Sequence, residues 1–143
     1  MEVIFVIVIL GILGTVAIPK LAATRDNAYI SKTTYNIMTI AQEVFSSAVA
    51  SGSVDPDLSN SSNILEHLVA IGEAQLNIPL RQATIQAGDV SDCIEFKVIA
   101  SGTDDNLSIS FNPHAGDTIC EGVQGLIDVS KYPLILKGQY VVR

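Results

Sequence analysis

The sequence predicts an α+β protein, in which one long N-terminal α-helix is followed by a small antiparallel β-sheet. Three observations lead to this prediction. An uninterrupted apolar run stands near the N-terminus, helical periodicity continues from it to about residue 50, and apolar and polar residues alternate in the second half of the chain. At 143 residues the chain has room for one domain and an appended helix, but not for two independent cores.

The apolar run covers residues 3–19 (VIFVIVILGILGTVAIP) and contains no charged residue. As a helix it would reach roughly 25 Å, close to a bilayer core of about 30 Å, and the uncharged residues 21–24 extend it. A buried strand, a core helix and a cleaved secretory signal are the alternatives. The run is too long for a strand and apolar on every side, and no basic segment precedes it. We therefore expect a transmembrane part in residues 1–24 and a globular domain in residues 25–143.

The basic residues nearest to this segment follow it instead of preceding it. Lys20 and Arg25 lie on its C-terminal side. By the positive-inside rule they would place the domain in the cytoplasm.

Residues 20–50 contain neither glycine nor proline, so the helix is expected to continue through them. Apolar residues recur there at helical spacings and mark one face: Ile30, Ile37, Ala41, Val44 and Ala48. Residues 51–53 (SGS) and the following Asp55-Pro56 should end the helix. A polar loop over residues 55–63 then leads into a short helix over residues 64–74, with Ser62 or Asn63 as its cap.

Beyond Pro79 the pattern changes to a period of two. Ile94, Phe96 and Val98 form one alternating set, and a second consists of Leu107, Ile109 and Phe111. These segments predict two antiparallel strands joined by a turn over residues 101–106. A further apolar stretch over residues 123–129 is interrupted by Gly125, and residues 134–142 supply a last strand candidate.

The composition argues against several classes of function. The net charge is −7 and only 8 Lys and Arg residues are present, so no dedicated nucleic-acid site is expected. Cys93 and Cys120 make one disulfide possible, which would indicate an oxidising compartment.

The candidate catalytic and metal-binding groups are sparse. Cys120 with His114 could form a nucleophile and base pair, but no third orienting group accompanies them. The two cysteines with His67 and His114 lack the short spacings of a zinc site. The acidic run Asp104-Asp105-Asn106 could bind calcium, although a solvated turn is the simpler interpretation. No Gly-rich phosphate loop is present. We expect no enzyme activity, no cofactor and no metal site.

Residues 2–19 resemble the N-terminal segment of type IV pilins and of the related pseudopilins of type II secretion. The family pattern is a glutamate, an apolar run with a central glycine, and then Ala-x-Pro. Glu2, Gly11, Ala17 and Pro19 match this pattern in register. The direct similarity covers about the first 30 residues, and the remainder agrees in architecture.

The resemblance implies a structural subunit that polymerises through its N-terminal helix into a type IV pilus. Glu2 would pair with the N-terminal amine of a neighbouring subunit, which explains a carboxylate whose cost at a bilayer centre is about 2.5 to 3.5 kcal/mol. The segment containing Gly11, Gly14 and Pro19 would unwind, as glycine weakens a helix and proline removes a backbone donor. Members often carry a C-terminal disulfide, which here would join Cys93 to Cys120.

The resemblance also implies partners and a location. Family subunits insert with a cytoplasmic N-terminus, helped by a basic leader that a prepilin peptidase removes. The resemblance therefore implies that the domain is exported, although Lys20 and Arg25 by themselves would favour the cytoplasm. The subunit would reside in the inner membrane and then, through the assembly machinery, enter an extracellular filament of identical copies. A pseudopilin of a type II secretion system, whose filament is periplasmic, is the alternative. A membrane-anchored periplasmic binding module is a more distant one.

The residues before Glu2 differ from the family pattern. Members carry Phe, Thr and two apolar residues before the glutamate, whereas only Met1 stands there. Either the start is truncated or this subunit departs from the family. A mature terminus at Met1 would place its amine about 4.5 Å along the helix from the usual position, which would alter the pairing with Glu2.

Overall fold

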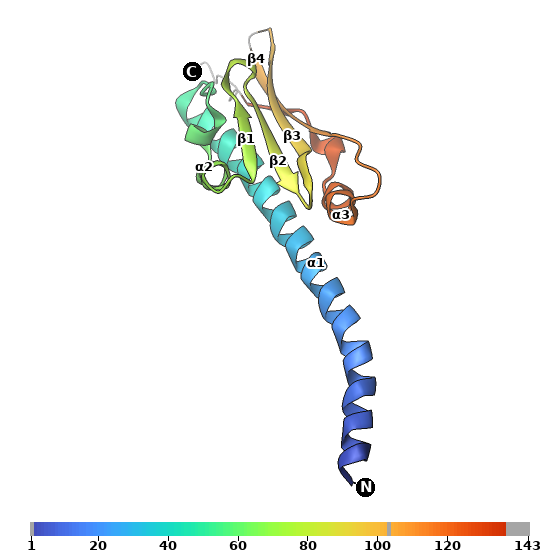
Figure 1. The fold of residues 1–143 in the computed structure, drawn as a ribbon. Helices are drawn as coiled ribbons and strands as arrows, with labels where there is room; N and C mark the ends of the chain where they lie inside the picture. Colours follow the sequence, from blue (N-terminus) through green and yellow to red (C-terminus); the bar gives the residue numbers. More distant parts are fainter. Residues whose placement is uncertain (1, 103, 137–143) are drawn as a thin grey trace.

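The computed structural model describes residues 2–102 and 104–136, and it confirms the α+β fold class. Helix α1 (Glu2–Ser51) projects far beyond the domain at its N-terminal end, and its other end lies against the sheet (Figure 1). The sheet has five strands in the order β1-β2-β3-β4-β5, all neighbouring pairs being antiparallel. The strands therefore follow one another in space as they do in sequence.

Helix α1 ends where its sequence indicates. Gly52 follows it with a φ of +75°, and the Gly52 amide donates to the carbonyl of Ala48 at 2.8 Å. This left-handed conformation is inexpensive for glycine, which lacks a Cβ, and it satisfies one of the last free carbonyls. The end of the long helix is thus set by local chemistry.

The C-terminal half of α1 supplies one layer of the core. Its buried residues include four of the five on the predicted apolar face, Ile30 being half-buried; the full set is Thr33, Ile37, Ile40, Ala41, Val44 and Ala48. They share one hydrophobic core with inward-facing residues of the sheet. The predicted amphipathic face is therefore confirmed.

Helix α2 (Asn63–Ala70) is shorter than the predicted segment 64–74, and a 3₁₀ turn (Leu58–Ser61) occupies part of the expected loop. Ser62 caps α2 by accepting the Leu65 amide at 3.1 Å, and it donates its hydroxyl to Glu43 of α1 at 2.5 Å. One buried serine therefore both starts α2 and fixes it to the long helix.

The central hairpin of the sheet is the one that the sequence predicts. Strand β3 (Val90–Ser101) pairs with β4 (Asp104–Phe111), so that Phe96 faces Ile109 and Val98 faces Leu107. The turn is tighter than the expected 101–106, because β4 already begins at Asp104. The alternating apolar residues of this pair line the core.

Two strands lie where none was predicted, β1 (Ala74–Asn77) and β2 (Gln82–Ala87), with a 3₁₀ turn (Ile78–Leu80) between them. Ala83, Ile85 and Ala87 alternate toward the core, but two of these three are alanines. Alanine has little strand preference, so the period of two carries a weak signal here.

The C-terminal region departs most from prediction. The apolar stretch 123–129 belongs to helix α3 (Thr118–Leu126) and to a 3₁₀ turn (Val129–Lys131). Strand β5 (Leu134–Ile135) pairs with β4 and represents the start of the predicted strand 134–142. Residues 137–142 of that prediction lie outside the described residues.

Candidate assembly site

The N-terminal half of α1 is exposed around its whole circumference. Every residue from Glu2 to Ala28 is exposed except Gly14, which is partly covered, and the large apolar side chains among them are exposed by 41% or more. Within residues 2–102 and 104–136, α1 is the one helix long and apolar enough to cross a membrane. None of the residues that the structure describes in the domain covers this apolar surface.

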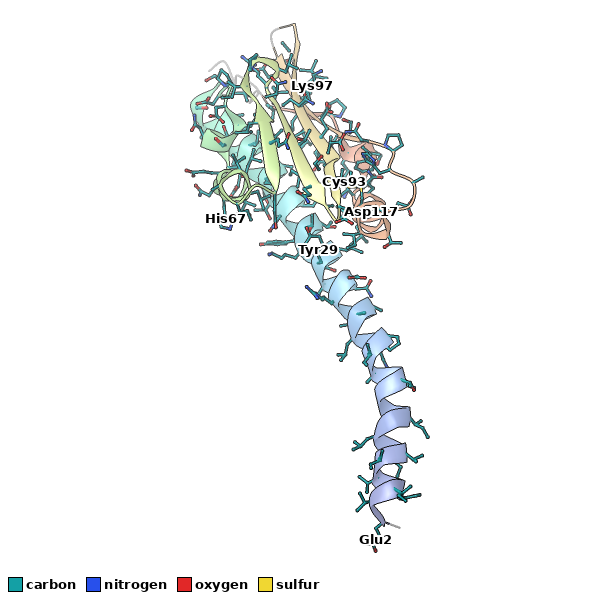
Figure 2. All side chains as sticks on the ribbon, in the orientation of Figure 1. Glu2, Tyr29, His67, Cys93, Lys97 and Asp117 are labelled. Atoms are coloured by element: carbon teal, nitrogen blue, oxygen red, sulfur yellow. A yellow bond between two sulfur atoms is a disulfide. The ribbon has the colours of Figure 1, made fainter. Side chains whose placement is uncertain are left out.

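Glu2 lies in the first turn of α1, at the end farthest from the domain (Figure 2). No group among the described residues forms a hydrogen bond or an ion pair with its carboxylate. At a helix N-terminus a carboxylate is favoured by the helix dipole, but this contributes only about 0.3 to 1 kcal/mol. A specific partner for Glu2 would have to come from outside the described part of the chain.

Gly11, Gly14 and Pro19 lie within an unbroken helix, so the expected unwinding is not a property of this single subunit. Proline leaves the carbonyl four residues earlier, that of Thr15, without its helical donor. A Cβ on Gly11 or Gly14 would meet no atom within 4 Å, so packing inside the subunit does not require glycine there. Unwinding on assembly stays a prediction, located in a segment that is intrinsically weak.

Cys93 of β3 and Cys120 of α3 form a disulfide, with their Cα atoms 5.8 Å apart. This is the pairing that the family resemblance implies. It leaves no free cysteine among the described residues, so a thiol nucleophile at Cys120 is excluded in this form of the protein. The bridge instead fastens α3 to the sheet.

Gln124 reinforces the same junction, and nothing in the sequence pattern singled it out. Its side-chain amide donates to the carbonyls of Cys93 at 3.0 Å and Asn112 at 2.9 Å. One helical side chain thereby satisfies backbone acceptors of β3 and of the segment after β4.

Asp117 caps α3 and holds the turn between β2 and β3. Its carboxylate accepts the amides of Ile119 and Cys120, both at 2.9 Å, and that of Asp89 at 3.0 Å. The amide of Cys120, followed by those of Asp89 and Ile119 and by the charge of His114, lowers the pKa of Asp117 against the opposing effect of burial. An aspartate directly before a helix is a capping signal that the sequence did contain.

Gly122 lies where α3 packs against α1. A Cβ at this position would lie 2.6 Å from Cδ1 of Ile30. A larger residue here would require the Ile30 side chain to shift.

The remaining candidates from the sequence are not gathered into one site. Nε2 of His114 lies 3.0 Å from a carboxylate oxygen of Asp92. His67 belongs to α2, on another part of the domain (Figure 2). A carboxylate oxygen of Asp105 lies 3.3 Å from a guanidinium nitrogen of Arg81, and Asp104-Asp105-Asn106 is the start of strand β4 instead of part of the expected turn. Among the residues that the structure describes, no group of three or more His, Cys, Asp or Glu side chains could hold a metal ion.

A long N-terminal helix packed on an antiparallel sheet, with a disulfide in the sheet half, is a pilin-like architecture. No protein-family model, curated protein or solved structure matches the chain. The likeness therefore rests on the architecture and on the N-terminal segment.

Proposed function

We propose that this protein is a structural subunit that polymerises through α1 into a type IV pilus filament. The observation that carries the proposal is the apolar half of α1, which is helical, projects from the domain and is exposed on every side. In water each of its large side chains would forgo about 1.5 to 3 kcal/mol of burial energy. Such a helix needs lipid first and then, outside the membrane, other helices.

The shape of the subunit supports a filament over a closed oligomer. The apolar half lies at one end and the polar domain at the other (Figure 1). Copies that stagger along their helices bury the apolar halves in a central bundle and keep the domains outside. A head-to-tail association of this kind does not close, so it continues as a fibre.

Glu2 is proposed to set the stagger between neighbouring helices. A carboxylate carried into an apolar bundle is costly without a cation, and the N-terminal amine of a neighbour is a suitable one. Membrane insertion itself does not need this pair, because Glu2 stands at the edge of the apolar segment.

The test is to express the full chain with pilus assembly machinery and to examine purified filaments by electron microscopy, identifying the subunit by mass spectrometry. We expect Glu2→Ala to remain in the membrane fraction and to lose most of the filament yield. Glu66→Ala, which removes an exposed acid of α2, is the matched control and should assemble normally. Normal filaments from Glu2→Ala would refute the role of Glu2.

The same preparation separates the two filament classes. Long surface filaments made of this chain would exclude a pseudopilin. Absence of such filaments, together with calcium-dependent stability of the domain, would favour the secretion system.

A further inference from the structure

A groove of about 400 Å³ lies at the base of the domain, where α1 leaves it. One wall is formed by Ala22, Arg25, Asp26 and Tyr29. Their spacings of three and four residues place them on one face of α1, directly before the buried face begins. Tyr29 marks this edge of the domain in Figure 2.

The opposite wall is made by the β2–β3 turn and by α3, through Gly88, Asp89 and Ile119. Asp117 holds this wall in place, because it accepts the amides of both Asp89 and Ile119. Gly88 lies so close to Asp117 that a Cβ on it would be 2.6 Å from a carboxylate oxygen. The groove is therefore built by a turn whose position is fixed, and not by a loose loop.

The groove presents one cation and two carboxylates. In the part of the chain that the structure describes, Arg25, Asp26 and Asp89 form no ion pair with one another or with other residues. A purely anionic ligand would be attracted by Arg25 and repelled by the two aspartates, whereas a ligand that carries both charges matches the set. The remaining lining, from Ala22, Ile119 and the ring of Tyr29, offers apolar surface beside these charges.

The position of the groove along α1 indicates where such a ligand would come from. Arg25 follows the apolar segment 3–19 by six residues, or about 9 Å of helix, and directly follows the uncharged residues 21–24. The hydrocarbon core is about 30 Å thick and residues 3–19 span roughly 25 Å of it, so with the segment centred the core ends about 2.5 Å beyond Pro19. Arg25 then lies about 6.5 Å into a headgroup layer that occupies about 5 to 8 Å on each side of the core. With the segment across the bilayer, the membrane-proximal end of the groove, at Arg25, therefore lies at the depth of the headgroups.

We propose that this groove binds the headgroup of a zwitterionic membrane phospholipid, with its phosphate at Arg25 and its ammonium between Asp26 and Asp89. The proposal rests on the membrane anchoring that is part of the proposed function. The bound lipid would fix the domain against the membrane surface before the subunit leaves the bilayer.

The test uses the full chain in bilayer nanodiscs that contain equal amounts of phosphatidylethanolamine and phosphatidylglycerol, released into native mass spectrometry. We expect retained phosphatidylethanolamine on the wild-type chain. Arg25→Glu should reduce this retention about fivefold, the effect of one exposed charge pair of about 1 kcal/mol. Lys32→Glu is the matched control, since it reverses a cation on α1 about 10.5 Å farther from the membrane and outside the groove.

The two carboxylates give a second, independent readout. Asp26→Asn combined with Asp89→Asn should shift retention from phosphatidylethanolamine toward phosphatidylglycerol, because only the cation remains. Preference of the wild-type chain for phosphatidylglycerol, or equal losses in Arg25→Glu and Lys32→Glu, would overturn the proposal. Displacement of the lipid by millimolar calcium would indicate that Asp26 and Asp89 bind a metal cation instead of the lipid ammonium, and would overturn the proposal.

Carbonate extraction of the same membranes distinguishes the two proposals. A chain that is extracted is not anchored, and both proposals fail. If the chain stays inserted but retains no phosphatidylethanolamine, membrane anchoring is supported and only the proposed lipid binding in the groove is refuted.

Discussion

The two halves of α1 belong to one continuous helix, yet they are stabilised in different ways. From Thr33 to Ala48 the helix buries one face against its own domain, whereas residues 2–28 bury none. An amphipathic stripe draws its stability from tertiary packing, and a helix that is apolar all round requires lipid or neighbouring helices. The C-terminal half of α1 is therefore packed within its own subunit, whereas the apolar side chains of the N-terminal half need lipid or other helices to cover them.

The largest expected effect comes from truncating equivalent isoleucines in the two halves. Ile40→Ala should lower the free energy of unfolding of the domain by about 2 to 5 kcal/mol, because Ile40 is fully buried and the change leaves a cavity. Ile7→Ala should leave domain unfolding unchanged, since Ile7 is 62% exposed in the subunit. Urea unfolding of the full chain in detergent micelles measures both, and equal losses would contradict the division of the helix.

Reduction of the disulfide should destabilise the domain and the C-terminal half of α1, but not the N-terminal half. The bridge joins residues 27 apart, so reduction should cost the domain about 3 to 4 kcal/mol on the chain-entropy estimate. Hydrogen exchange in micelles should then rise in the C-terminal half of α1 and remain slow in the N-terminal half. Intact mass confirms reduction through one added hydrogen per sulfur, and parallel loss of protection in both halves would refute their independence.

A smaller effect is expected at the contact between α1 and α3. Gly122→Val should destabilise the domain by about 1 to 3 kcal/mol more than Gly125→Val, because only the first introduces a side chain against Ile30. Both substitutions make the same Gly-to-Val change within α3, so their difference in thermal unfolding reports mainly on the contact with Ile30. Equal effects would mean that Ile30, at the boundary between the two halves, moves aside freely.

The smallest effect is a pH dependence that belongs to the domain alone. The pKa of Asp117 is lowered in the folded state, so the unfolded state binds more protons, and the contribution of Asp117 to stability is present above about pH 4 and lost below it. Asp117→Asn should flatten part of the fall in the urea midpoint between about pH 5 and pH 3. Asp26→Asn, which changes an exposed aspartate outside the core, is the control. If the urea midpoint of Asp117→Asn falls with pH as it does in the wild-type chain, Asp117 does not contribute to the loss of stability in acid.

Strong periodic patterns predicted their elements well. The buried face of α1, its glycine stop and the β3–β4 hairpin all followed from spacing and residue type, because in each case one local signal dominates. Strands β1 and β2 and helix α3 were not predicted, because the sequence signal there is weak or mixed. The alanine-rich β2 becomes a strand because it pairs with β3, and residues 123–126 become helical because Asp117 caps them and Cys120 ties them to the sheet.

The sequence by itself determined the long helix, its apolar half and the carboxylate at its start, since these depend only on the order of residues along one element. Packing between distant segments decides which face of the helix the domain covers. It also decides that residues 2–28 stay exposed. The same is true of the groove at Arg25 and Tyr29, whose second wall comes from residues about 60 to 90 positions later in the chain. Such a site forms only when the β2–β3 turn and α3 are brought to the helix, because no local pattern encodes which distant segments will meet.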